Sequence, residues 1–177
     1  MEHFEFRQLT AGDCHRLRDI DASQYIKNAW REVDGERKLI AIDYHDKGWP
    51  NGYDAHHQAL LETIENSGIA IGAFDQERKL VGFASMNREL FGEKYKYVLL
   101  DQLFITVELR GKGIGSKLFM LVAEVAKQWE AERLYICAGS AEDTIQFYHS
   151  IGCREAEEIN KELYESDPRD VQLEYVL

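Results

Sequence analysis

Several features that would place a chain in other classes of protein are scarce here or missing. The 177 residues include three cysteines, Cys14, Cys137 and Cys153, an odd number without paired spacing, which excludes a disulfide framework or a zinc signature. Only two prolines occur and no Pro- or Gly-rich linker divides the chain, so we expect one domain over residues 1–177. No run is apolar enough to span a bilayer or resembles a signal peptide, so we expect a cytoplasmic protein without a membrane partner.

Positive charge is also scarce. The chain has 21 Lys and Arg against 32 Asp and Glu, a formal net charge of −11. Nucleic-acid binding needs a basic footprint, so this balance argues against a nucleic-acid partner. It is compatible with a cationic small substrate, and equally with acidity that serves only solubility. The stretch from His45 to His57 lacks convincing metal-ligand spacing, and we expect no metal.

The first half of the chain predicts a strand, two helices and a loop. Alternation at Phe4–Leu9 predicts the strand. Thr10, with Asp13 three residues on, is close to a capping box for a helix that would extend to about Tyr25. Periodicity breaks from about 43 to 53, which predicts a loop, and Asp54 can then cap a helix that ends at 66–68.

The second half predicts a mixed sheet. Strand-like runs separated by short polar turns predict an antiparallel meander, and a strand, two helices and a closing strand follow. Glu155, Glu157 and Glu158 form a charge run, read as a solvated face. The resulting fold class is α/β of the mixed α+β kind, with a mostly antiparallel central sheet of about six or seven strands flanked by about four helices. The predicted elements are strands 69–74, 80–90, 95–106, 134–138 and 171–177 and helices 114–129 and 143–151.

A glycine-rich loop, Arg110-Gly111-Lys112-Gly113-Ile114-Gly115, stands between the third of these strands and the longer helix. Glycines let the backbone turn tightly and approach a ligand closely. The free N–H groups at a helix start point at an anion, and the helix dipole favours negative charge there. A pyrophosphate would fit this loop. The alternative is a turn that binds no ligand and only tightens strand-to-helix packing.

Two common pyrophosphate motifs do not match the loop. A P-loop counted from Gly111 needs a second glycine where Ser116 stands, and Lys117 is followed by Leu118 instead of a hydroxyl residue. The dinucleotide fingerprint counted from Gly111 or from Gly113 also lacks its last glycine. The preceding strand leaves a meander, whereas a dinucleotide-binding unit opens with its strand in a βαβ crossover.

The loop is similar to a third pattern, Gln/Arg-x-x-Gly-x-Gly/Ala, the acyl-CoA signature of the GNAT superfamily of N-acetyltransferases. Arg110, Gly113 and Gly115 match it. Downstream, the segment Phe147 to Cys153 resembles the family's Leu/Phe-Tyr-x-x-x-Gly-Phe, and the order of elements agrees from Phe4 to Leu177. One departure is Ala141, seven residues before Tyr148, where the family often has an Asn that contacts the pantetheine arm.

The resemblance implies acetyl-CoA as co-substrate, without a metal. It implies that backbone groups near Leu103 and Ile105 pair with the pantetheine, and that the N–H groups of 111–116 hold the pyrophosphate. A backbone N–H near Leu103 or Phe104 would polarise the thioester carbonyl. The expected cofactor-binding residues are Leu103, Phe104, Ile105, Arg110, Gly111, Lys112, Gly113, Ile114, Gly115, Ser116, Lys117 and Phe147.

Two residues are candidates for catalysis. A lysine-like amine has a pKa near 10.4, so a general base is expected to help deprotonate it. Asp101 is the candidate base because period-two spacing puts it on one face with Leu103 and Ile105. The alternative is a solvated or cap-forming carboxylate. Tyr148 matches the family's tyrosine and is expected to protonate the leaving thiolate. The alternative is a buried tyrosine whose ring fills the core.

The predicted function is transfer of the acetyl group of acetyl-CoA to a primary amine by direct attack on the thioester. The net charge, with Asp43, Asp46 and Asp54, suggests a small cationic acceptor. The irregular segment with Tyr44, Asp46, Trp49 and Tyr53 is expected to rim the acceptor pocket, or else to be merely structural. The alternative function is a non-catalytic acyl-CoA-binding regulatory module. The oligomeric state stays open, a homodimer included.

Overall fold

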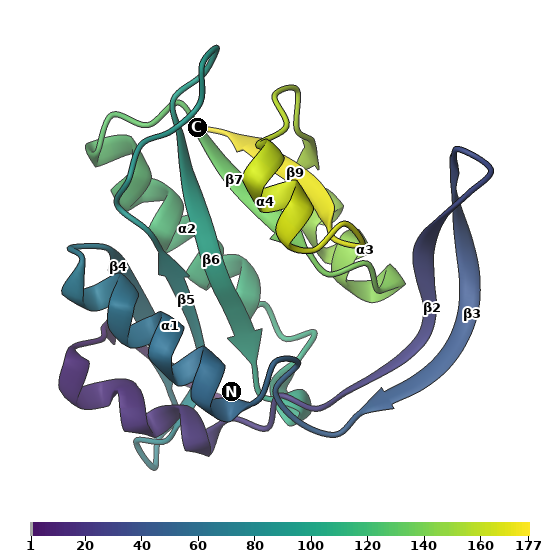
Figure 1. Ribbon diagram of the computed structural model, residues 1–177. Coiled ribbons are helices and arrows are strands. Elements are labelled where there is room, and N and C mark those ends of the chain that lie inside the picture. The colour runs from purple at the N-terminus through teal and green to yellow at the C-terminus, as the bar shows by residue number, and fades with distance from the viewer. Residues whose placement is uncertain (1) are drawn as a thin grey trace.

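The computed structural model describes residues 2–177 and has a central mixed sheet (Figure 1). In these residues the sheet holds seven strands in the order β1-β4-β5-β6-β7-β9-β8, and a separate hairpin pairs β2 with β3. The strands are β1 (Glu5–Gln8), β2 (Gln24–Val33), β3 (Glu36–Asp46), β4 (Ile69–Phe74), β5 (Leu80–Met86), β6 (Tyr97–Ile105), β7 (Arg133–Ala138), β8 (Arg154–Glu155) and β9 (Val171–Val176).

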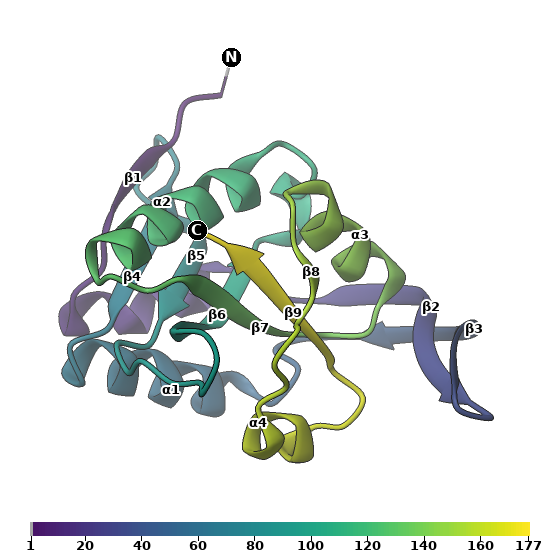
Figure 2. The same ribbon diagram turned by 90° about the horizontal axis from the view of Figure 1, so that it is seen from above.

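Helices cover both faces of the sheet. Figure 2 shows α1 and α4 on one side and α2 and α3 on the other. We call these the α1/α4 face and the α2/α3 face. The helices are η1 (Ala11–Asp19) and η2 (Val107–Leu109), both 3₁₀, and α1 (Tyr53–Glu65), α2 (Ile114–Gln128), α3 (Glu142–Ser150) and α4 (Lys161–Ser166). This architecture confirms the predicted fold class, although β8 and α4 had no counterpart among the predicted elements.

The predicted meander is confirmed and ends at a change of strand direction. β4, β5 and β6 pair antiparallel in sequence order, whereas β6 and β7 are parallel. The parallel pairing joins only Tyr97–Leu100 to Arg133–Ile136. β6 then continues to Ile105 without a β7 partner, and Figure 1 shows the two strands diverging beyond that point. We call the stretch where β6 and β7 no longer pair the opening.

Two apolar clusters hold the layers together. On the α2/α3 face, fully buried side chains of α2 such as Leu118, Phe119 and Val122 pack against those of β6 and β7 such as Val98 and Leu134. The helical spacing that predicted α2 is the spacing that gives it this apolar stripe. On the other face, η1 and α1 pack against β4 and β5 in a second cluster. Both clusters border β6, which is therefore fixed from two sides.

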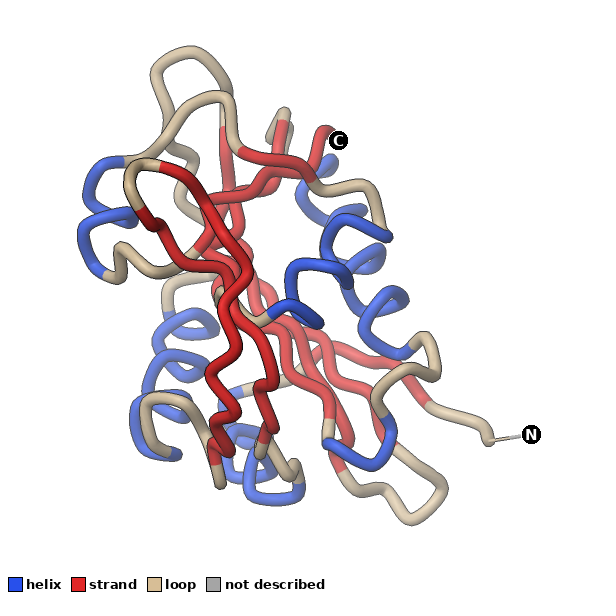
Figure 3. Tube along the Cα trace, turned by 90° about the vertical axis from the view of Figure 1, so that its right-hand side faces the viewer, coloured by secondary structure: helices blue, strands red, loops and turns tan. Residues whose placement is uncertain are grey.

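The hairpin corrects the predicted loop at 43–53. Residues 43–46 belong to β3, and Tyr25, which was assigned to the first helix, lies in β2. The exposed β3 lacks a buried face, so it carries no clean period-two pattern. Figure 3 shows the hairpin crossing in front of the sheet. It is attached to the segment after β7, where Trp30 N–H donates to the Ser140 carbonyl at 2.8 Å.

The first two helices also differ from prediction, one in its type and end and the other in its cap. The first helix is 3₁₀ and ends at Asp19, with Ile20 as its C-cap. Its predicted capping box is confirmed, since the Asp13 carboxylate accepts the Thr10 N–H at 2.9 Å. The N-cap of α1 is Gly52, at φ 85°, and Asp54 lies inside the first turn, so Asp54 as cap was wrong. A glycine caps this helix because its backbone has the positive φ that glycine adopts without strain.

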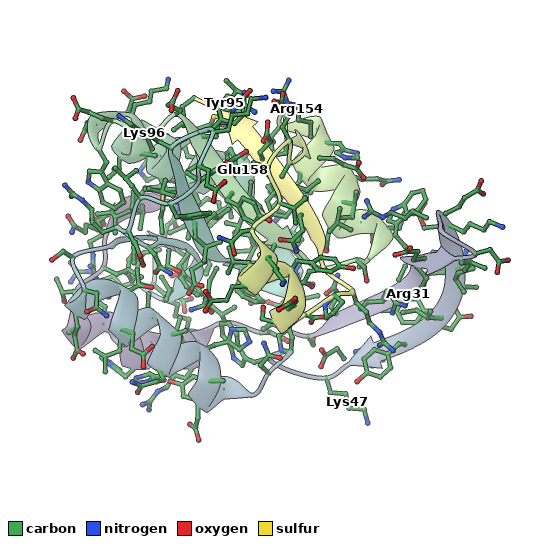
Figure 4. The ribbon with its side chains drawn as sticks, turned by 45° about the horizontal axis from the view of Figure 1, so that its top comes forward. Arg31, Lys47, Tyr95, Lys96, Arg154 and Glu158 are labelled. Carbon is green, nitrogen blue, oxygen red and sulfur yellow. The ribbon has the colours of Figure 1, made fainter. Side chains whose placement is uncertain are left out.

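The glutamate run at 155–158 is more than a solvated face. Glu158 accepts the N–H groups of Lys94 at 3.0 Å and of Tyr95 at 3.5 Å. Glu158 lies below Tyr95 in Figure 4, where the turn between β5 and β6 comes down to it. Glu157 contacts Arg154, with 3.1 Å between Arg154 Nη2 and Glu157 Oε1. The hydrogen bonds of Glu158 fix the turn that leads into β6.

Candidate functional site

The glycine loop presents an open helix N-terminus. α2 begins at Ile114, and its first intrahelical bond runs from Lys117 N–H to the Gly113 carbonyl at 3.1 Å. The N–H groups of Ile114, Gly115 and Ser116 therefore have no partner within the helix. No acidic residue stands in the first turn. A helix start of this kind is suited to an anion.

The first two glycines of the loop keep the space in front of the helix free. Gly111 has φ 78° and Gly113 has φ 87°, backbone conformations that side chains rarely adopt. A Cβ built at either position would meet no atom within 4 Å. These glycines therefore do not relieve packing against the protein. They shape the backbone and leave room for a bulky anion.

The third glycine has a different task. A Cβ at Gly115 would lie 3.3 Å from two ring atoms of Phe147 and 3.7 Å from Ile105. Gly115 therefore lets α3 approach the start of α2 and the end of β6. Gly115 is needed for packing, whereas Gly111 and Gly113 keep space open.

The basic side chains of the loop are held by protein groups. Arg110 Nε donates to the Ile105 carbonyl at 2.9 Å, and burial lowers the pKa of its guanidinium. Lys112 Nζ lies 2.9 Å from Glu2 Oε2, and Lys117 Nζ lies 5.0 Å from the centre of the Phe6 ring. The open anion site is therefore made mainly of backbone N–H groups.

The unpaired part of β6 adds a second set of free backbone groups. Thr106 N–H donates to the Val81 carbonyl at 2.8 Å, on the β5 side. Alternate residues of an antiparallel pair turn their backbone groups to the same neighbour, so Phe104 also faces β5. Leu103 and Ile105 then face the opening toward β7. The Arg110 contact with the Ile105 carbonyl agrees with this direction.

A β-bulge at Asp101 changes which face its side chain occupies. From Gln102 to Leu100, β6 advances two residues while β5 advances one, from Ser85 to Met86. The extra residue is Asp101. Leu103 and Ile105 pack with the α2/α3 cluster, whereas Asp101 lines a cavity beside α1. The prediction that Asp101 shares their face was wrong, because period-two spacing fails at a bulge.

The cavity at Asp101 lies between α1 and the chain that follows β5. It has a volume of about 460 Å³ and is lined by Ala59, Glu62, Thr63, Asn66, Asn87, Arg88, Glu89 and Asp101. Asp101 is exposed at the cavity, yet the surrounding protein displaces water from its carboxylate and so raises its pKa; His56 opposes this shift and the charge of Glu62 adds to it. A carboxylate with a raised pKa is a better proton acceptor than an ordinary aspartate. None of the segment 43–53 lines this cavity, so the rim predicted from that segment is not found there.

Trp49 and Tyr53 instead join an aromatic cluster under α1. The ring centre of Trp49 lies 5.0 Å from those of His56 and Phe104. His56 Nε2 accepts the Asn51 N–H at 3.3 Å, so its Nδ1 carries the proton and donates to Gln102 Oε1 at 2.7 Å. This histidine is 8 % exposed and is engaged at both nitrogens. It positions β6 and the loop at 49–51.

Tyr148 lies on the other face of the sheet. It is buried on α3, with its ring centre 5.2 Å from that of Phe147 and 6.4 Å from that of Phe119. Burial raises the pKa of its hydroxyl, and Cys153 adds to the shift. The phenol is therefore protonated at neutral pH. The two candidate catalytic residues lie on opposite faces of the sheet, Asp101 beside α1 and Tyr148 beside α2.

Cys137 on β7 had no assigned role in the sequence. The last residues that pair across β6 and β7 are Leu100 and Ile136. Asp101 and Cys137 are therefore the first residue of each strand beyond the pairing between β6 and β7. Burial raises the pKa of the Cys137 thiol to about 12, and the charges of Asp170 and Asp101 contribute. No sequence motif marks this pair, because it depends on where the two strands separate.

Two absences bear on the chemistry. Among residues 2–177, no three His, Cys, Asp or Glu side chains converge as a metal site would require. No helix in the same part of the chain is long and apolar enough to cross a membrane.

Comparison with known proteins decides the family. The model of the acetyltransferase (GNAT) family matches residues 37–153, which is more than half of the chain. This protein belongs to the GNAT family of acetyltransferases. The match includes both the glycine loop and the Phe147-Tyr148 segment, so it confirms the resemblance drawn from them. No curated protein matches the chain.

Solved structures agree on the fold. A nourseothricin acetyltransferase superposes with a TM-score of 0.75 at 17% identity, covering 98% of each chain. A protein of Bacillus anthracis str. Ames, provisionally assigned as a streptothricin acetyltransferase and solved with acetyl coenzyme A, gives 0.71 at 16%, covering 99% of this chain and 98% of that one. The PaiA N-acetyltransferase of Thermoplasma acidophilum, solved with coenzyme A, gives 0.62 at 16% and covers 99% of both. At these identities the likeness shows the GNAT fold.

Proposed function

We propose that this GNAT protein transfers the acetyl group of acetyl-CoA to a primary amine of a small, cationic acceptor. The observation that carries the proposal is the alignment of two sets of free backbone groups. The open N-terminus of α2 stands directly beyond the unpaired edge of β6. Such an edge can pair with the amides of a pantetheine arm while the helix start holds its pyrophosphate.

The residues present fit that co-substrate. The N–H groups of Ile114, Gly115 and Ser116 would hold the pyrophosphate in the space that Gly111 and Gly113 leave open. Leu103 and Ile105 would pair with the pantetheine, once Arg110 releases the Ile105 carbonyl. Phe147 and Gly115 would form one wall beside it. When bound, acetyl-CoA supplies an activated acetyl group as a thioester.

Three protein groups would then act on the reaction. Asp101 removes a proton from the acceptor amine, directly or through water, because only the neutral amine can attack. The Leu103 N–H faces the opening and donates to the carbonyl oxygen as negative charge develops there. Tyr148 protonates the leaving thiolate from the α2/α3 face. The new bond joins nitrogen to the acetyl carbon, and the carbon–sulfur bond breaks.

The acceptor would approach from the α1/α4 face. The cavity at Asp101 lies on that face, and Glu62 and Glu89 add two further carboxylates to its lining. A cationic amine is attracted to such a lining, and the net charge of −11 has the same sign. Two of the similar structures are named as acetyltransferases of nourseothricin and of streptothricin, which is in keeping with a small acceptor.

Calorimetry of acetyl-CoA binding tests the cofactor half of the proposal. Gly113→Asp would place a carboxylate against the pyrophosphate, and we expect affinity to fall by about 100-fold, equivalent to about 2.7 kcal/mol. Gly113→Asn is the matched control, since it has the same shape and the same positive-φ strain without the charge. Binding should persist with a chelator present, because the anion is held by N–H groups. A strict magnesium requirement, or equal affinities of the two variants, would contradict the assignment.

An acceptor screen tests the catalytic half. Release of free thiol from acetyl-CoA is measured with a panel of primary amines, and the acetylated product is identified by mass. Turnover of at least one amine is expected. Tight binding of acetyl-CoA with no turnover of any amine would favour the non-catalytic acyl-CoA-binding module instead.

A further inference from the structure

Two buried polar atoms have no hydrogen-bond partner within residues 2–177: Ser85 Oγ and Gln172 Nε2. Both lie beside the point where β6 and β7 separate. Ser85 on β5 is opposite Gln102, next to the bulged Asp101, and Gln172 on β9 is opposite Cys137. Buried polar groups are satisfied in the great majority of proteins. Ser85 is separated from the opening by β6, whereas Gln172 pairs with the residue at which β7 leaves β6, so the orphan of Gln172 is the one that points to a ligand.

The carboxamide of Gln172 is buried beside Cys137, on the strand that pairs with β7. Cys137 is the first residue of β7 beyond the pairing with β6, and its Sγ lies 3.6 Å from Gln172 Oε1. Gln172 is 5 % exposed. Tyr135, two residues before Cys137 on the same side of β7, has its hydroxyl contacted by the N–H of Asn160, just before α4. Gln172 is opposite Cys137 on the neighbouring strand, so its side chain lies on the same side as those of Cys137 and Tyr135. That side is the α1/α4 face, where Asp101 also lies.

The bonds around the carboxamide fix which end is free. Tyr135 Oη lies 2.6 Å from Gln172 Oε1 and accepts the Asn160 N–H at 3.1 Å. The Tyr135 hydroxyl must therefore donate its own proton to the carboxamide oxygen. The Cys137 thiol donates to the same oxygen. The end left over is the NH₂ group, which can only donate.

We propose that Gln172 is a specificity-determining residue, and that its free NH₂ donates to an oxygen of the acceptor close to the attacking amine. The inference rests on the proposed function and narrows its substrate class. The preferred acceptor carries a carbonyl or hydroxyl oxygen a few bonds from the amine, as an amino-acid amide does. Asp101 takes the amine on the β6 side of the opening, and Gln172 takes the oxygen on the β9 side.

The chemistry of the site favours an oxygen over a second amine at this end. An ammonium group has donors and no acceptor, so it gains nothing from the Gln172 NH₂. A site built to donate to a substrate oxygen rejects the analogue that lacks it, because the buried donor then stays unpaired.

The test compares two amines of the same shape. β-Alaninamide has a carbonyl where isoamylamine has only a branched hydrocarbon. We expect the wild-type protein to acetylate β-alaninamide with a higher kcat/KM than isoamylamine, mainly through a lower KM. In Gln172→Leu the ratio of the two kcat/KM values should fall at least tenfold from its wild-type value. Comparing this ratio between the two proteins cancels the difference in amine pKa, because that difference is the same in both.

Two further variants separate recognition from damage to the fold. Gln172→Glu keeps an oxygen for Tyr135 and Cys137 and removes the NH₂, so it should also lose the preference, even if the leucine variant does not fold. Tyr135→Phe removes one bond to the carboxamide and keeps its NH₂, so the preference should persist. Equal wild-type rates for the two amines, or a ratio of the two kcat/KM values that is the same in Gln172→Glu as in the wild type, would overturn the inference. The proposed function would survive either result, since its own tests are acetyl-CoA binding and turnover of some primary amine.

Discussion

The two faces of β6 serve the proposed reaction by different means. On the α2/α3 face, Gly111 and Gly113 shape a binding surface made of backbone N–H groups. On the α1/α4 face, the side chains of Asp101, Cys137 and Gln172 come together from three strands. The first surface suits a co-substrate shared by a whole family, because backbone groups are the same in every sequence. The second depends on side chains and can differ from one member to the next.

Replacing Asp101 is the strongest test of the α1/α4 face, where the acceptor would bind. Asp101→Asn keeps the shape and removes the base, so kcat should fall by about 100-fold. Wild-type kcat/KM should decline as pH falls through the raised pKa of Asp101, because protonation abolishes the base. In the variant the inflection at the pKa of Asp101 should be absent, and kcat/KM should instead follow the protonation of the amine itself. Rates measured across the acidic and neutral range check both effects.

Glu62→Gln is the matched control for that experiment, since Glu62 lines the same cavity. It should lower kcat/KM far less and leave the acidic decline in place. If the two variants were equally impaired, Asp101 would contribute only negative charge, and the face would lack a base.

Tyr148 tests the α2/α3 face. Tyr148→Phe keeps the ring and removes the hydroxyl, so kcat should fall about tenfold, while acetyl-CoA affinity and melting temperature change little. Tyr175→Phe is the control, because Tyr175 also packs its ring against Phe119, at 5.1 Å. A wild-type kcat in Tyr148→Phe with an intact fold would mean that water protonates the thiolate or that it leaves unassisted.

Salt should affect the two substrates in opposite directions. Screening weakens the attraction of a cationic acceptor to an acidic protein, so its kcat/KM should fall several-fold as salt rises. Acetyl-CoA is an anion, and its kcat/KM should not fall in the same series. Initial rates at a fixed pH and increasing sodium chloride concentration give the kcat/KM of each substrate. Parallel declines would argue against a cationic acceptor.

Asp170 gives the smallest expected effect. Burial and the charge of Asp167 raise its pKa to about 7, whereas an unfolded aspartate titrates near 3.9. Between about pH 4 and pH 7 the folded state holds the extra proton, so stability falls as pH rises through that window. Asp170→Asn mimics the protonated form. Its melting temperature should exceed the wild type's by a few degrees at pH 8 and approach it near pH 4, and a constant difference would contradict the assigned pKa.

The sequence marks the glycine loop clearly and the side chains of the α1/α4 face hardly at all. Three glycines in fixed order after a strand have few other uses, so the loop at 110–115 could be recognised directly. The bulge at Asp101 leaves no such mark, because one extra residue in a strand looks like ordinary alternation. Gln172 is more than thirty residues from Cys137 in sequence, and only strand pairing joins them. The exposed hairpin was missed because neither of its faces is consistently buried.

The bulge at Asp101 has a consequence for how relatives of this protein are compared. Before the bulge the even-numbered residues of β6 face α2, and after it the odd-numbered residues do. Deleting one residue there would turn Leu103 and Ile105 away from α2 or force a different register with β5. A homologue without the insertion therefore aligns correctly only with a gap at this position. Without that gap, each residue assigned to the acceptor side downstream would in fact belong to the other face.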